Sequence, residues 1–121
     1  MKYLLMIYDD EAAWAAKSPQ ELQDVMGEYY AFGDSIRGIM LGGEALQPTP
    51  TAKTVKVRDG QSLITDGPYA ETKEQLGGFY LVECQSEDEA VQAAARIPGA
   101  RWGTVEVRAC QVFPEAPEHP A

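Results

Sequence analysis

The stretch with the clearest chemical potential is residues 66–83, which begins with the sequence Asp66-Gly67-Pro68-Tyr69. Glycine permits a positive φ angle and proline fixes φ near about −65°, so a tight turn is expected here. A carboxylate in a partly apolar cleft can be held near a useful pKa and act as a general base. Asp66 is therefore the candidate catalytic residue, and the chemistry it offers is proton transfer.

A structural role for Asp66 competes with this hypothesis. The side chain can instead accept backbone N–H bonds in an Asx turn beside Gly67 and Pro68. The residues alone favour the turn role over the catalytic one. Both roles stay open, because an aspartate before glycine and proline suits either.

The candidate ligand-binding residues are of two kinds. Some lie in this turn and in the loop after it, and the others are polar side chains on other predicted elements. They are Tyr29, Glu44, Gly67, Pro68, Tyr69 and Lys73. If Glu44 faces the same cleft as Asp66, two close carboxylates would raise the pKa of one of them. The alternatives are a solvated charged loop with weak ion pairs and tyrosines that serve packing rather than binding.

Composition and missing motifs exclude several function classes. A net charge of −9 argues against nucleic acid and against an anionic membrane surface. The single histidine, His119, lies in a proline-rich tail, so histidine chemistry is not expected. No phosphate-binding glycine loop, metal-ligand spacing or cofactor motif is present, and we predict neither a metal nor a cofactor. No apolar run is long enough to span a bilayer, and a cytoplasmic location is expected.

Hydrophobic periodicity predicts one domain of alternating strands and helices. A capping box at Ser18 and Glu21 marks a helix start, and Asp59-Gly60 is a strong hairpin signal. Three glycines in the first helix either allow close packing or end the helix near Gly38. The expected elements are a strand over 2–8, a polar connection over 9–17, a helix from 18 to about 38, strands over 40–46, 53–58, 61–65 and 77–84, a helix over 86–97, and a strand over 103–112.

The order strand, helix, strand, inserted hairpin, strand, helix, strand indicates an α+β sandwich with one antiparallel sheet and two helices on one face. Residues 1–113 form the expected domain, and residues 114–121 form a loose proline-rich tail. Paired glycines at Gly42-Gly43 suggest a bulge or a close approach within a strand.

The run from Asp66 to Tyr80 resembles the signature of the YCII-related family, in the branch named for its Asp-Gly-Pro-Phe motif. Tyr69 stands where that branch usually has phenylalanine. Similarity also covers residues 3–8, 42–46 and 105–108. The resemblance implies a ferredoxin-like βαββαβ fold with an inserted hairpin, paired between two chains into a dimeric α+β barrel. In such a sheet Cys84 and Cys110 flank the first strand on opposite sides, about 9–10 Å apart, and should be free thiols.

The resemblance implies a fold more firmly than an activity. In some members of the wider family the resemblance implies a His–Asp pair, with the histidine on the first helix and the aspartate just before a proline that ends the second. One relative is a dehydrochlorinase. This chain reads Gly27-Glu28-Tyr29 and Ile97-Pro98 at those places, so we do not carry the lyase chemistry over. The first hypothesis is a homodimer that binds a small polar or aromatic molecule beside Asp66. The rival is a non-enzymatic regulatory module, with an extracytoplasmic-function sigma factor as partner by family analogy only.

Overall fold

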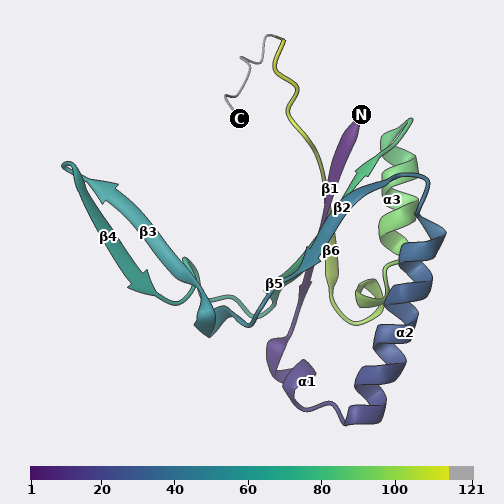
Figure 1. The fold of residues 1–121 in the computed structure, drawn as a ribbon, viewed down its shortest axis with the longest axis horizontal. Coiled ribbons are helices and arrows are strands. Elements are labelled where there is room, and N and C mark those ends of the chain that lie inside the picture. The colour runs from purple at the N-terminus through teal and green to yellow at the C-terminus, as the bar shows by residue number, and fades with distance from the viewer. Residues whose placement is uncertain (115–121) are drawn as a thin grey trace.

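The structure, a computed structural model, describes residues 1–114 and shows a four-stranded antiparallel sheet with helices against one face (Figure 1). The strand order is β2-β5-β1-β6, the order of a ferredoxin-like fold, as predicted. The predicted tail lies outside the described residues apart from Pro114, and so does His119. The elements are β1 (Lys2–Asp9), α1 (Glu11–Ala15), α2 (Pro19–Ser35), β2 (Met40–Ala45), β3 (Lys53–Arg58), β4 (Gln61–Asp66), β5 (Gln75–Glu83), α3 (Glu87–Ala95) and β6 (Thr104–Ala109), with short 3-10 turns at Thr49–Thr51 and Pro98–Arg101.

The hydrophobic core lies between the sheet and the helices α2 and α3. Alternation along β1 sends Tyr3, Leu5 and Ile7 into this core, while the residues between them face the other side. Phe32 and Ile36 from the α2 end and the alanines of α3 cover these side chains. Small alanine side chains let α3 lie close to the sheet. Within residues 1–114, no helix lies against the second face of the sheet (Figure 1).

Capping groups fix where the helices begin. The Ser18 hydroxyl accepts from the Glu21 N–H at 3.2 Å, and the Glu21 carboxylate accepts from the Ser18 N–H at 3.0 Å, so the predicted capping box is confirmed. At α3 the Ser86 hydroxyl accepts from the Glu89 N–H at 3.2 Å. The Glu89 carboxylate accepts from Gln85 rather than from the cap residue. Within residues 1–114, no helix has the length and apolar character needed to cross a membrane.

Several predicted boundaries were wrong. The expected polar connection over 9–17 contains the helix α1, because the Asp10 side chain accepts from the Ala12 N–H and caps it. Helix α2 ends at Ser35, close to the predicted end near Gly38. The alternative, close packing at its glycines, is wrong, because a Cβ at Gly27, Gly33 or Gly38 would meet nothing within 4 Å. Strand β5 begins at Gln75 and β6 ends at Ala109, earlier than the sequence patterns indicated.

Strand β2 has a bulge directly before its glycine pair and a close approach at Gly43. The register with β5 shifts between Met40 and Gly42, and a Cβ at Gly43 would lie 2.7 Å from the Phe79 carbonyl oxygen. The cysteine prediction is also confirmed, since β5 and β6 flank β1 on opposite sides and both thiols are free.

Candidate functional site

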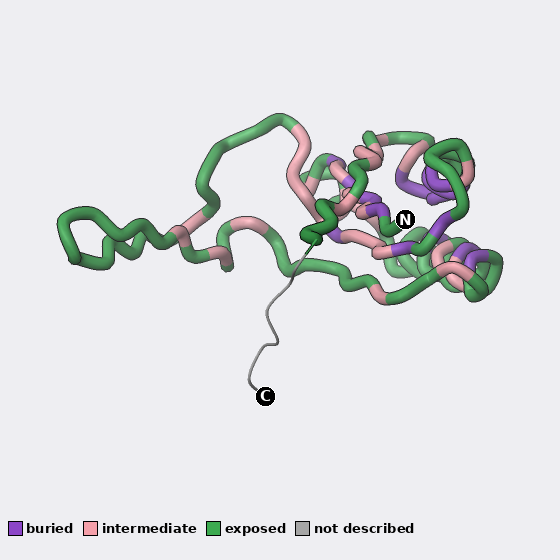
Figure 2. The backbone as a smooth tube through the Cα atoms, turned by 90° about the horizontal axis from the view of Figure 1, so that it is seen from above, coloured by how far each residue is buried: buried purple, intermediate pink, exposed green. Residues whose placement is uncertain are grey.

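Strands β3 and β4 form a hairpin over residues 53–66, which we call the arm, and the Asp66-Gly67-Pro68-Tyr69 turn lies at its base. The arm pairs only within itself and projects from the body of the molecule (Figures 1 and 2). Its tip turns at Asp59 and Gly60, with φ angles of 51° and 74° that match a two-residue hairpin turn. At the base Gly67 has φ 98°, so glycine is required there, as the turn prediction implied.

Asp66 is the last residue of the arm, and its side chain is 83% exposed. It forms an ion pair with Lys53, its cross-strand partner. The Asx-turn prediction was wrong: the Gly67 N–H donates to the Ala52 carbonyl at 2.7 Å, and Pro68 has no N–H to donate. The carboxylate is therefore not used to shape the turn.

The arm is held at its base by polar contacts from α1. The Glu11 carboxylate accepts from the Thr49 N–H at 2.6 Å and from the Thr49 hydroxyl at 2.8 Å. The Glu11 N–H in turn donates to the Gln75 side chain at 3.0 Å, at the start of β5. Glu11 therefore ties both chain segments that lead into and out of the arm to the body.

The other turn and loop candidates are exposed to solvent. Tyr69 is 82% exposed, and the Lys56 ammonium lies 5.8 Å from its ring centroid. Pro68 and Lys73 are also exposed. Asp66, Pro68 and Tyr69 are thus open to solvent at the arm base in a single chain, and Lys73 is open to solvent in the loop before β5.

Tyr29 lies in a different part of the molecule. It is on α2, and its hydroxyl oxygen accepts from the Gly99 N–H at 3.2 Å. Burial raises the pKa of Tyr29 to about 12, with a further contribution from the charge of Asp9. Tyr29 also borders a shallow groove of about 420 Å³ with Tyr80 and Arg37. Its main contact is structural, because it satisfies a buried backbone N–H.

Replacing Tyr29 with phenylalanine is expected to lower the free energy of unfolding by about 1–3 kcal/mol, because the Gly99 N–H loses its acceptor. The native state raises the pKa of this phenol above its ordinary value of 10.0. Wild-type stability should therefore be fully present below pH 10 and fall as the pH rises toward 12. Denaturant titrations between pH 10 and 12 should show that the free energy of unfolding falls less steeply with pH for the Tyr29→Phe variant than for the wild type. Equal dependence on pH in the two proteins would contradict the prediction.

Glu44 lies on the sheet surface that no helix covers, which we call the open face. In register it stands opposite Phe79, which in turn pairs with Met6 of β1. The apolar centre of the open face is formed by Leu4, Met6, Leu76, Phe79 and Leu81. No contact among the described residues joins Glu44 to Asp66.

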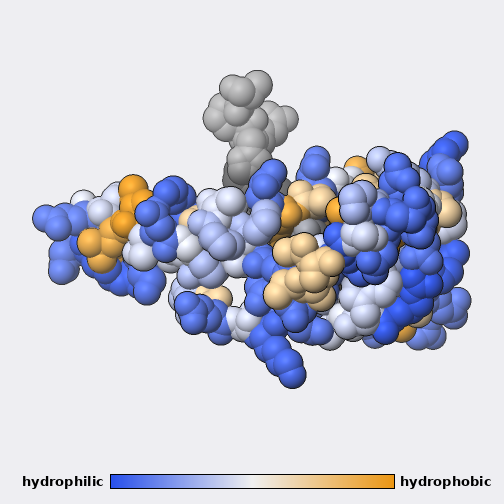
Figure 3. Space-filling view, turned by 90° about the horizontal axis from the view of Figure 1, so that it is seen from below, coloured by the Kyte–Doolittle hydropathy of each residue, from blue (hydrophilic) through white to orange (hydrophobic). Residues whose placement is uncertain are grey.

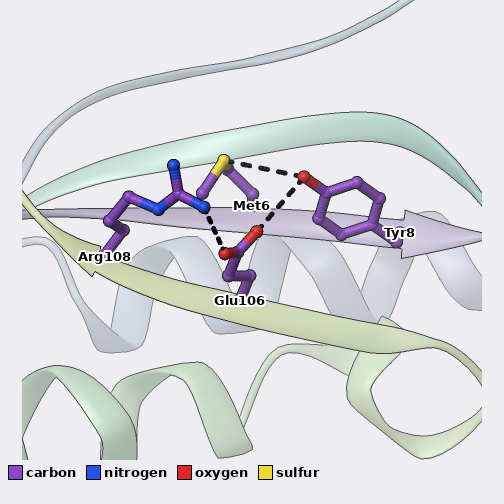
Figure 4. Close-up of polar contacts among 4 residues, drawn as sticks. All are labelled: Met6, Tyr8, Glu106 and Arg108. Atoms are coloured by element: carbon purple, nitrogen blue, oxygen red, sulfur yellow. Dashed lines mark hydrogen bonds and ion pairs between the residues drawn. The ribbon is translucent and has the colours of Figure 1, made fainter. Parts of the chain in front are cut away.

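A polar cluster on the open face was missed by sequence reasoning. The Tyr8 hydroxyl donates to the Glu106 carboxylate at 3.3 Å and approaches the Met6 sulfur at 3.8 Å (Figure 4). Arg108 donates to the other Glu106 oxygen at 2.6 Å. Burial, and then the charge and hydrogen bond of Glu106, raise the pKa of Tyr8. The alternation Val105-Glu106-Val107-Arg108 carried the signal, because it places both charges on one strand face.

Asp9 is the one buried charged residue among those described, and sequence reasoning did not single it out. The Trp14 indole N–H donates to its carboxylate at 2.5 Å, which joins α1 to the end of β1. A Cβ on Gly103 would lie 2.9 Å from the Asp9 Cβ, and a Cβ on Gly77 would contact the Asp9 carboxylate at 3.4 Å. The close packing leaves no room for a ligand, so Asp9 serves to position α1.

The structure thus separates the predicted site residues into three places. The arm base holds the turn residues, with Lys73 in the loop that follows; the open face holds Glu44, and α2 holds Tyr29. On the helix side, Glu28 forms an ion pair with Arg101, and Ile97 is buried in the core. Within residues 1–114 no group of three or more metal-binding side chains occurs.

Three comparisons place the chain among known proteins. The model of the YCII-related domain matches residues 1–114. An uncharacterised protein of Rhizobium meliloti (strain 1021) is 38% identical over 117 residues, which are 93% of this chain and 94% of that protein. A solved structure of 5-chloro-2-hydroxyhydroquinone dehydrochlorinase from Burkholderia phenoliruptrix AC1100, in complex with 2,5-dihydroxybenzoquinone, matches 92% of this chain and 94% of its own with 17% identity and a TM-score of 0.49. Similarity at that level says nothing about activity.

Proposed function

The chain belongs to the YCII-related family, and on that premise we propose that it binds a small polar or aromatic molecule beside Asp66, as a homodimer. The chemistry proposed for the site is proton transfer to the Asp66 carboxylate. The proposed ligand contacts are Gly67, Pro68, Tyr69 and Lys73, and exposed Tyr69 would supply an aromatic face for the ligand.

The observation that carries this proposal is the state of the Asp66 carboxylate. Lys53 pairs with one of its oxygens, and among residues 1–114 no group donates to the other. Since the side chain is 83% exposed and plays no part in the turn, its conservative replacement should leave the fold intact. An exposed carboxylate whose second oxygen receives no donor from residues 1–114 is accessible to a polar ligand group.

The homodimer is supported by the composition of the open face. Its centre is apolar, while charged side chains stand at both edges: Glu44 on β2, and Glu106 with Arg108 on β6. An apolar centre with a polar rim is the usual anatomy of a protein interface. An antiparallel sheet can leave a polar face in water, but an uncovered face with an apolar centre favours such a partner.

Replacing Asp66 with asparagine tests the proposal. Asparagine keeps the size of the side chain but cannot act as a carboxylate base, so the melting temperature should change by less than about 2 °C. A thermal-shift screen of small phenols and aromatic acids identifies compounds that raise the melting temperature of the wild type. These compounds should not raise the melting temperature of the Asp66→Asn variant.

The matched control is Asp59→Asn, which removes an exposed aspartate at the other end of the arm. This control should bind the same compounds as the wild type. Retained binding by the Asp66→Asn variant would place the ligand site elsewhere on the molecule.

The alternative function is a non-enzymatic regulatory or interaction module. The uncovered apolar side chains of the arm favour it, because such a surface also suits a protein partner. A sigma factor is the partner suggested by family analogy alone. A homodimer that leaves the arm free would favour this alternative.

A further inference from the structure

We propose that the arm is a dimerisation element that docks on a second copy of this chain through one of its two faces. That contact brings Asp66 into the interface, so that the site beside it is built by both copies. The inference rests on the proposed function and deepens it, since it states what encloses the ligand. The argument starts from the register of the hairpin.

The register divides the arm into two unlike faces. Cross-strand pairs share a face, so Val55 with Ile64, Val57 with Ser62 and Lys53 with Asp66 lie together on one side, which we call the docking face. The opposite face holds Thr54 with Thr65, Lys56 with Leu63 and Arg58 with Gln61. Three β-branched apolar side chains therefore lie in a row on the docking face, and the Asp66 ion pair stands at its end.

These apolar side chains are uncovered in a single chain. Val55, Val57 and Ile64 are 61%, 59% and 67% exposed, and hydrophobic surface is visible on the projecting arm (Figure 3). An isolated two-stranded hairpin is marginally stable at best in water. A face of this kind on a strand pair with no other neighbours is expected to be buried by a partner.

A second copy offers a surface that suits the docking face. The docking face is apolar and carries no net charge, because its Lys53 pairs with its Asp66. The centre of the open face is likewise apolar, with Leu4, Phe79 and Leu81. The open face of the same chain is also uncovered, so two copies related by a two-fold axis can satisfy both surfaces at once.

The arm is positioned for this contact before assembly. Glu11 holds Thr49 and Gln75 at the arm base, and the Gly67 N–H closes the base onto Ala52. A fixed arm loses little conformational freedom when it docks, which favours association. The same anchoring sets Asp66 at the inner end of the docking face rather than on a mobile loop.

A pair of adjacent substitutions tests the proposal. Ile64→Asp places a charge on the docking face, and Leu63→Asp places the same charge one residue away on the opposite face. Both positions are exposed in one chain, so both variants should keep the wild-type circular dichroism spectrum. Sedimentation equilibrium should show that Ile64→Asp raises the dimer dissociation constant roughly 100-fold. Leu63→Asp should change it less than about threefold.

The outcomes separate this proposal from the proposed function. A dimeric wild type with an unaffected Ile64→Asp variant would overturn the arm contact and leave the homodimer standing. Equal weakening by both substitutions would overturn the assignment of one docking face. A wild type that is monomeric at micromolar concentration would overturn the contact and the homodimer together. Ligand loss in the Asp66→Asn variant tests the binding role independently, because that substitution does not touch the apolar row.

Discussion

Replacing Gly103 with alanine is expected to lower the free energy of unfolding by about 3 kcal/mol and the melting temperature by roughly 10 °C. A Cβ at this position would lie 2.3 Å from the Tyr8 carbonyl oxygen and 2.9 Å from the Asp9 Cβ. Neither atom can move away alone, because β1 is paired on both sides by β5 and β6. The end of β1 or the turn before β6 must therefore shift, and either shift disturbs the core.

Gly38→Ala is the matched control, since a Cβ there meets nothing within 4 Å. Its free energy of unfolding, measured by urea titration with circular dichroism, should lie within about 0.5 kcal/mol of the wild-type value. A Gly103→Ala protein as stable as the control would show that the contact between this turn and β1 is looser than the structure shows. The same experiment reports on Asp9, because the new methyl group would press on its side chain.

The fold follows from local signals that agree with one another. The Ser18 capping box, the Asp59-Gly60 turn and the apolar run over residues 2–8 each predict an element that the structure contains. The helix α1 escaped prediction because five residues carry too little periodicity to distinguish it from a connection. Its cap, Asp10, was visible in the sequence, but it lies beside two other acidic residues that disguise it.

The site could be predicted only in part, because its geometry depends on relations between strands. Positive φ at Gly67 followed from the turn sequence, whereas the pairing of Asp66 with Lys53 required the hairpin register. The role of Tyr29 depended on a contact with Gly99, 70 residues away along the chain. Tyr8 and Glu106 were missed for the same reason, since their contact joins strands 98 residues apart.

Replacing Leu81 with lysine is expected to raise the dissociation constant of the homodimer by roughly 100-fold or more. Leu81 lies on the open face of β5, opposite Leu4 of β1. In a single chain the new ammonium group reaches solvent, so the fold should be retained. In the proposed dimer the same charge would be buried without a partner, which costs several kcal/mol. Light scattering across a dilution series measures the change as a loss of dimer mass.

Val91→Lys is the matched control, because Val91 is an exposed aliphatic residue on α3, on the helix side of the sheet. It introduces the same charge on the opposite layer and should leave the dimer mass unchanged. If Leu81→Lys dimerises like the wild type, the open face does not form the interface. The dimer could instead be lost in both Leu81→Lys and Ile64→Asp while the Val91→Lys and Leu63→Asp controls keep it. Neither surface alone would then hold two copies together at the concentrations tested, so the two-fold assembly must use the open face and the arm together.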